Sequence, residues 1–304
     1  MPKNLPMAIL GKTGLDVTRL GFGAMEIRDL ADLPEDRSLT GKQAQMMLNA
    51  VLDSGINFLD TSIDYGRSEE IIGKYISHRR SEFYLASKCC CPALPDLLGG
   101  GHVFTRENII AGVNQSLERL NTDYIDIIQL HNPTVEDVEK GDLVSVLNDL
   151  RRDGKVRWIG VSATLPHLST FIEWQVFDEF QIPYSALLRN HEDVISTASD
   201  IGMGTVIRGG VSKGEPGVSG VSRPDAWAKF DEANLDDLRE DGESRTAFVL
   251  RFTLSHSQIH TIIVGTQNRM HLDENVAVAQ RGPLSIDVYE EAKRRLSAVG
   301  VGSE

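Results

Sequence analysis

The sequence contains little cysteine. Its three cysteines, Cys89, Cys90 and Cys91, are consecutive. Neighbouring residues of a strand point to opposite faces, so these thiols form a poor cage for one metal ion, and no second cysteine cluster exists to complete a zinc or iron–sulfur site. We therefore expect three small, buried side chains on a strand, no metal site, and no disulfide framework, as is typical of a reducing compartment.

Long apolar runs and an excess of positive charge are also lacking. No stretch approaches the roughly 18 apolar residues of a membrane span, and the first residues do not form the apolar run of a signal peptide. The formal net charge is −13, and an acidic surface repels nucleic acid and anionic membranes. We expect a cytoplasmic protein that binds neither, as a monomer or a weak homo-oligomer.

Short apolar runs alternate with amphipathic segments from Leu20 onward. Several runs are nearly continuous, as in parallel strands that are buried on both faces. The expected strands are Leu20–Gly23, Asn57–Leu59, Phe83–Ser87, Ile125–Leu130, Trp158–Val161, Phe180–Ile182, Thr205–Ile207 and Thr261–Val264. Eight strands, each followed by a helix, predict an α/β fold of the (β/α)8 TIM-barrel type, with one domain over residues 1–304.

A doubly wound sheet is the alternative fold. Gly21-Phe22-Gly23 continues to Met25 without the third glycine of a dinucleotide-binding turn, which weighs against that alternative. Helical periodicity fills the intervals between strands. The clearest helical segments are Gly41–Asp53 with Thr40 as a candidate N-cap, the stripe after Thr105, Leu143–Leu150 and Thr246–Leu254.

Two additions flank the expected barrel. Ala8–Leu10 and Val17–Leu20, joined by the turn Gly11–Gly14, predict an N-terminal β-hairpin that closes the bottom of the barrel. The stretch Ser212–Asn234 contains Gly, Ser and Pro followed by charged residues, and it predicts a long loop after strand seven. Such a loop would lie on the carboxyl rim, where the active sites of barrels form.

Ionisable residues follow three consecutive expected strands. Asp60, Lys88 and His131 each come at a strand end, and Tyr65 lies in the loop after Asp60. A buried charge needs a partner, so we expect Asp60 to pair with Lys88. The ammonium would then lower the pKa of Tyr65, and His131 would orient a carbonyl oxygen. This is a proton donor beside a carbonyl, for which a cofactor has to supply hydride.

Several motifs resemble the aldo-keto reductase family, in order over about residues 10–278. They are Leu10–Leu15, Leu20–Gly23, Asn57–Ser62 with Tyr65-Gly66 and Ser68-Glu69, Asp123–Asp126 and Gly160–Ser162. The family's tetrad corresponds to Asp60, Tyr65, Lys88 and His131. The resemblance implies an NAD(P)H-dependent oxidoreductase that reversibly reduces an aldehyde or ketone to an alcohol. Its small-molecule substrate would contact Met25, Tyr65 and His131.

The resemblance also implies a nucleotide site along the rim. The residues implied to bind the cofactor are Gly23, Ala24, Asp60, Ser162, Gln181, Arg208, Gly209, Gly210, Val211, Gly214, Gly265, Thr266, Gln267, His271, Glu274 and Asn275. Ala163 replaces the family's nicotinamide-binding Asn. Arg208 stands where a tyrosine often stacks on the nicotinamide, and its planar guanidinium can stack in the same way.

The preference between NADP(H) and NAD(H) is inferred from the family resemblance. The Lys and Arg that many members use for the 2′-phosphate align with Gly265 and His271, and Thr266 and Arg269 are the available substitutes. The resemblance therefore implies NADP(H), with NAD(H) as the alternative cofactor.

Two other functions stay open. A Schiff-base lyase would use Lys88 as its nucleophile, although pairing with Asp60 would keep Lys88 charged. A non-catalytic nucleotide-binding barrel would report redox state to a partner, although the tetrad is complete. The substrate pocket is expected from the loops Met25–Leu33, Pro92–His102, Asn132 and Ser212–Trp227, with Arg28, His102 and Trp227 as candidate contacts.

Overall fold

The computed structural model describes residues 4–28, 39, 41–94, 101–217 and 223–303. The strands are β1 Met7–Ile9, β2 Asp16–Thr18, β3 Leu20–Gly23, β4 Phe58–Asp60, β5 Tyr84–Cys89, β6 Ile125–His131, β7 Val156–Ser162, β8 Glu179–Pro183, β9 Gly204–Arg208 and β10 Thr261–Val264. The helices are α1 Gly41–Asp53, α2 Ser68–Ile76, α3 Arg106–Leu120, α4 Val135–Lys140, α5 Leu143–Arg152, α6 His167–Trp174, α7 Glu192–Asp200, α8 Pro224–Glu232, α9 Arg245–Ser255, α10 Arg269–Arg281 and α11 Ile286–Ala298.

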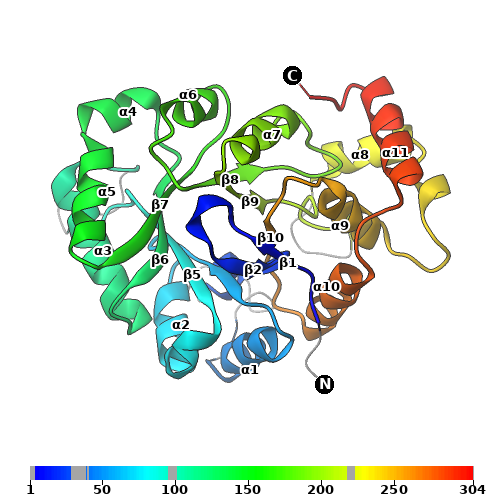
Figure 1. Ribbon diagram of the computed structural model, residues 1–304. Coiled ribbons are helices and arrows are strands. Elements are labelled where there is room, and N and C mark those ends of the chain that lie inside the picture. Colours follow the sequence, from blue (N-terminus) through cyan, green and yellow to red (C-terminus); the bar gives the residue numbers. More distant parts are fainter. Residues whose placement is uncertain (1–3, 29–38, 40, 95–100, 218–222, 304) are drawn as a thin grey trace.

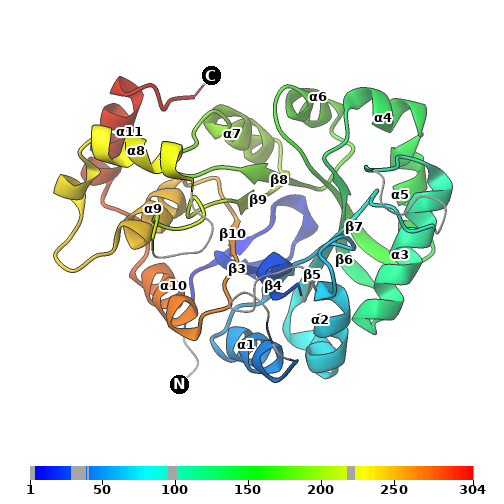
Figure 2. The same ribbon diagram turned by 180° about the vertical axis from the view of Figure 1, so that it is seen from behind.

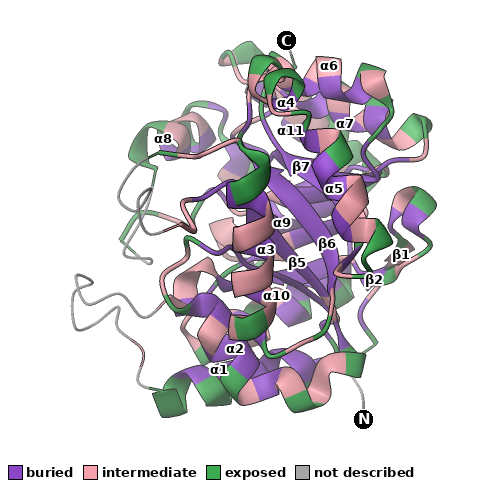
Figure 3. Ribbon diagram, turned by 90° about the vertical axis from the view of Figure 1, so that its left-hand side faces the viewer, coloured by how far each residue is buried: buried purple, intermediate pink, exposed green. Residues whose placement is uncertain are grey.

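Eight parallel strands close into a barrel in the order β10-β3-β4-β5-β6-β7-β8-β9, with the helices around it (Figure 1). All seven residues of β6 are buried, because the strand lies between the barrel interior and the outer helices (Figure 3). The prediction of a (β/α)8 barrel is confirmed.

The strands extend further toward their carboxyl ends than the apolar pattern indicates. Asp60, Lys88 and His131 lie within β4, β5 and β6 rather than after them. The parallel ladder pairs Asp60 with Gly23 and His131 with Ser162. Backbone pairing does not depend on side-chain polarity, so the ladder continues through residues that the hydrophobic pattern leaves out.

The N-terminal hairpin is confirmed and lies across the amino end of the barrel (Figure 1). Leu10 and Val17 are buried in a cluster with Phe58, Ala86, Ile127 and Val206 from the barrel interior. At Gly11 the backbone has a φ of +49°, and a Cβ atom there would lie 2.4 Å from the Gly204 nitrogen. Glycine therefore permits the hairpin to seat against β9.

The expected helices are present. Thr105 caps α3 by accepting a hydrogen bond from the Asn108 amide, and Gly41–Asp53 forms α1 as expected. The candidate cap Thr40 lies outside the described residues. Among those residues, no helix combines the length and apolar character that crossing a membrane requires.

The segment after β9 differs from the expected continuous loop. Residues 224–232 form α8, which begins with Pro224 at its first turn and buries Trp227 and Phe230 on one face. Proline is favoured at that position, and the two aromatic residues, three apart, lie on the same side of a helix. Residues 218–222 of the expected loop lie outside the described part of the chain.

The three cysteines are buried as expected, but only Cys89 belongs to the strand. Cys90 has a φ of +80°, which ends β5 and turns the chain, and Cys91 follows in the loop. The expectation of a strand running through all three residues was wrong.

Candidate active site

A cavity of about 1090 Å³ opens at the carboxyl end of the barrel, the end that faces the viewer in Figure 2. Its wall contains Asp60, Tyr65 and His131, together with the ends of β7, β8 and β9. The tetrad residues therefore meet at one place, although they come from three strands and a loop. Lys88 lies beneath this wall and is buried.

Asp60 and Lys88 form a buried ion pair at the floor of the cavity. Lys88 Nζ donates to Asp60 Oδ1 at 2.8 Å, to Oδ2 at 2.7 Å and to the Thr61 carbonyl oxygen at 2.9 Å. Gln181 Nε2 donates to Asp60 Oδ1 at 2.7 Å. Burial alone would lower the pKa of Lys88, but the charge of Asp60 and its hydrogen bonds with Lys88 outweigh the effect of burial and raise that pKa. Lys88 is thus held as an ammonium ion.

Tyr65 lies next to this ammonium, with Lys88 Nζ 4.9 Å from its ring centroid. Burial raises the pKa of Tyr65, and the opposing effect of Lys88 is smaller. The expected lowering of the Tyr65 pKa was therefore wrong in direction. Desolvation of the phenol is the dominant effect, and the negative charge of Asp60 opposes the effect of Lys88. Tyr65 is accordingly a neutral phenol at neutral pH.

His131 lies at the end of β6, with its ring centroid 6.3 Å from that of Tyr65 and the rings nearly perpendicular. Burial lowers the pKa of His131 to about 3, and the charge of Lys88 acts in the same direction. A neutral imidazole with one N–H results. Its Nδ1 faces Cys91 Sγ at 3.4 Å, which leaves Nε2 for other partners.

Fifteen of the sixteen residues predicted to bind a cofactor line the cavity. Ala24 is the exception, because it is buried and its carbonyl oxygen accepts a hydrogen bond from Ser68 Oγ. The sequence pattern missed further wall residues, among them Arg223 and the pair Ser244 and Thr246 at the start of α9. They are far from the tetrad in sequence and carry no motif.

Two features of this wall suit a dinucleotide. Arg208 Nε is buried without a hydrogen-bond partner among the described residues, as expected of a guanidinium placed for a ligand. Gly209 and Gly214 have φ values of +75° and +79°, a conformation that favours glycine, and all of residues 209–214 line the cavity. Ser162 and Gln181, hydrogen-bonded at 3.1 Å, add polar groups beside Asp60.

The far end of the cavity reaches the first turns of α9 and α10. Glu274 accepts a hydrogen bond from Ser244 Oγ at 2.6 Å. Arg269 lines the wall beside His271, and its Nε pairs with Asp273 at 3.0 Å. The amino ends of helices favour phosphate groups.

The candidate substrate residues are only partly on the wall. Met25 and Asn132 line the cavity, whereas Arg28, His102 and Trp227 do not. Trp227 is buried and donates to the Ser212 carbonyl oxygen at 3.3 Å, so it supports the segment after β9. His102 packs on His131 instead, with ring centroids 4.7 Å apart. Residues 29–33 and 95–100 of the expected pocket loops lie outside the described residues.

Comparison with known proteins places these observations in a family. The model of the Aldo/keto reductase family matches residues 19–295. An uncharacterized oxidoreductase, YqkF, of Bacillus subtilis is 27% identical over 89% of this chain and 90% of its own. L-galactose dehydrogenase of Arabidopsis thaliana is 26% identical over 90% and 88%. The holo form of aldo-keto reductase AKR11C1 from Bacillus halodurans superposes with a TM-score of 0.83 at 24% identity, covering 96% of each chain.

Proposed function

This chain belongs to the aldo/keto reductase family, and on that premise we propose that it reversibly reduces an aldehyde or ketone to an alcohol with NADPH. The observation that carries the proposal is the neutral Tyr65 phenol beside the Lys88 ammonium, at the wall of a cavity large enough for a nucleotide and a small substrate. When bound, the nicotinamide supplies hydride to the carbonyl carbon.

Residues of this chain bind and protonate the carbonyl oxygen. His131 Nε2–H donates a hydrogen bond to that oxygen and orients it. Tyr65 gives its proton to the oxygen as negative charge develops there, and the phenolate left behind is stabilised by Lys88. Asp60 holds Lys88 in position. The cavity wall around Arg208 and the segment 209–214 would bind the nicotinamide and the pyrophosphate.

The competing lyase function has less support. A Schiff-base lysine has to lose its proton before it can attack a carbonyl. Asp60 holds the pKa of Lys88 above its ordinary value against the effect of burial, and Lys88 is shielded beneath the cavity wall. Borohydride treatment with substrate is therefore expected to leave Lys88 unmodified.

The decisive experiment is the Tyr65→Phe variant, assayed by NADPH oxidation across a panel of aldehydes, ketones and sugars. General-acid catalysis contributes about 10²–10⁴-fold, so we expect kcat to fall by that order while NADPH binding is retained. Tyr84→Phe, at the amino end of β5, is the matched control and should keep wild-type activity. Equal NADPH oxidation by Tyr65→Phe and the wild type would refute the proposal.

A further inference from the structure

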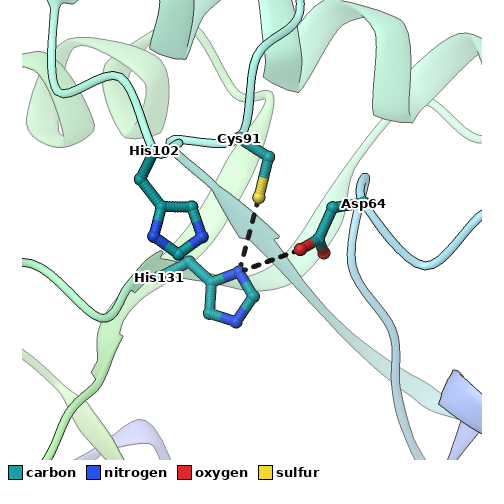
Figure 4. Close-up of side chains that lie close together, drawn as sticks. All are labelled: Asp64, Cys91, His102 and His131. Atoms are coloured by element: carbon teal, nitrogen blue, oxygen red, sulfur yellow. Dashed lines mark hydrogen bonds and ion pairs between the residues drawn. The ribbon is translucent and has the colours of Figure 1, made fainter. Parts of the chain in front are cut away.

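Four side chains that can bind a metal converge on the side of His131 that faces Asp64. They are Asp64 from the loop after β4, Cys91 and His102 from the segment after β5, and His131 from β6 (Figure 4). One ligand atom from each lies within 4.8 Å of the other three. The expectation of no metal site was based on three adjacent cysteines, whereas this cluster uses one cysteine and three residues distant from it in sequence.

The distances in the cluster are close to those of a tetrahedral site. Zn²⁺ binds imidazole nitrogen at about 2.0–2.1 Å and thiolate sulfur at about 2.3 Å, so neighbouring ligand atoms lie roughly 3.3–3.8 Å apart. His131 Nδ1 is 3.4 Å from Cys91 Sγ and 3.7 Å from Asp64 Oδ2. The widest separations, up to 4.8 Å, need a movement of about 1 Å, which a half-exposed His102 and an exposed Asp64 can make by rotation of their side chains.

The chemistry of the donors selects the ion. Two imidazoles, a thiolate and a carboxylate form a mixed nitrogen, sulfur and oxygen set, which Zn²⁺ accepts in four-coordinate sites and which Mg²⁺ and Ca²⁺ disfavour. We propose that Asp64, Cys91, His102 and His131 bind one Zn²⁺ ion. The thiolate and the carboxylate neutralise its charge, and the proton displaced from Cys91 passes to solvent as the sulfur–zinc bond forms.

The surroundings hold these ligands in place. Ser62 Oγ donates to Asp64 Oδ1, and Asn108 Nδ2 donates to the Cys91 carbonyl oxygen at 3.0 Å. The ring of Phe104 packs against His102 at 5.9 Å between centroids. Groups that orient the ligands in this way raise metal affinity.

The inferred site goes beyond the proposed reduction and does not depend on it. Zn²⁺ would occupy Nδ1 of His131, while the other ring nitrogen points away from Cys91 and Asp64 (Figure 4). Metal at Nδ1 leaves the remaining proton on Nε2. The bound ion would therefore fix the tautomer that donates to a carbonyl oxygen, linking zinc occupancy to the state of His131.

The test uses the full-length chain, freed of metal and of any affinity tag, titrated with Zn²⁺ against a chromophoric chelator. We expect one tightly bound ion per chain. Cys91→Ser and His102→Ala should each weaken binding by about tenfold or more, since each removes a direct ligand. Cys89→Ser is the matched control, because Cys89 Sγ donates to the Gln129 carbonyl oxygen at 3.4 Å and serine can keep that bond.

Co²⁺ absorption provides a second, independent readout of the same site. The wild type and Cys89→Ser should show the near-ultraviolet thiolate-to-Co²⁺ absorption and the visible bands of a tetrahedral ion, and Cys91→Ser should lack the thiolate band. Failure of the wild type to bind one equivalent of Zn²⁺, or equal affinities in Cys91→Ser and wild type, would overturn the proposal. Because Tyr65→Phe keeps all four ligands, its Zn²⁺ affinity should not change, which separates this site from the reduction.

Discussion

Lys88 Nζ contacts both carboxylate oxygens of Asp60, at 2.8 and 2.7 Å, and the two side chains are 1% and 2% exposed. Transfer of two such charges from water into the protein interior is unfavourable. Their mutual attraction offsets this desolvation penalty only while both partners are present. The pair therefore couples the stability of the barrel to the electrostatics of the active site.

Asp60→Asn should leave the Lys88 ammonium buried without a counter-charge. Loss of one partner of a buried pair costs about 3–5 kcal/mol, so we expect the free energy of unfolding to fall by that order. Urea unfolding monitored by circular dichroism measures it. The double variant Asp60→Asn with Lys88→Met removes both charges, and it should recover much of the stability while remaining inactive. An additive loss in the double variant would contradict the coupling.

Stability should also depend on pH through His260, which does not line the cavity. Its Nδ1 accepts hydrogen bonds from the Thr205 amide at 3.0 Å and is 2.7 Å from Thr205 Oγ1. Burial lowers the pKa of His260 to about 4, with the charge of Arg19 acting in the same direction. The folded state thus binds fewer protons than the unfolded state between about pH 4 and 6.5, so this stabilisation is present above pH 6.5 and is lost as the pH falls.

The variant His260→Gln should therefore be less stable than the wild type at pH 7, and the difference should shrink on acidification. One proton contributes at most about 1.4 kcal/mol per pH unit. Urea unfolding at pH 7 and pH 5 should reveal a narrowing of about 1–2 kcal/mol. His78→Gln replaces an exposed histidine as the control. A difference that stays constant between the two pH values would exclude this role for His260.

Cofactor preference can be measured directly. If Arg269 contacts the 2′-phosphate, Arg269→Ala should raise the Kd for NADPH by about tenfold, as the loss of one charge-assisted hydrogen bond of about 1.5 kcal/mol predicts, and leave the Kd for NADH unchanged. Arg294→Ala, an exposed arginine on α11, is the control. Fluorescence titration reports both constants. Equal Kd values of the wild type for NADPH and NADH would overturn the NADPH assignment and leave the role of Tyr65 intact.

The sequence predicts most of the barrel because buried parallel strands have a continuous apolar pattern. The limits of Leu20–Gly23 and Thr261–Val264 agree with the structure residue for residue. The pattern fails at α8, where charged residues surround Trp227 and Phe230 and only tertiary packing shows that these two share a buried face. A single domain over residues 1–304 and a cytoplasmic location stay predictions.

The sequence predicts those features of the site that follow from the order of the strands. It does not predict those that follow from how deeply a side chain is buried or how a loop turns. Strand ends of a parallel barrel meet at one rim, so the convergence of Asp60, Lys88 and His131 follows from their positions in sequence. The direction of the Tyr65 pKa shift depends on how far the phenol is buried. The approach of Cys91 to His131 depends on the turn at Cys90. Neither quantity is encoded in a local pattern.

The β1–β2 hairpin has a kinetic consequence. Leu10 and Val17 fill the amino end of the barrel. Among the described residues, cofactor and substrate therefore reach Asp60 through the cavity at the carboxyl end. Two reactants that share one approach obstruct each other, and the one bound deeper has to arrive first and depart last. Product-inhibition patterns under initial-velocity conditions would then be those of an ordered bi-bi sequence rather than a random one.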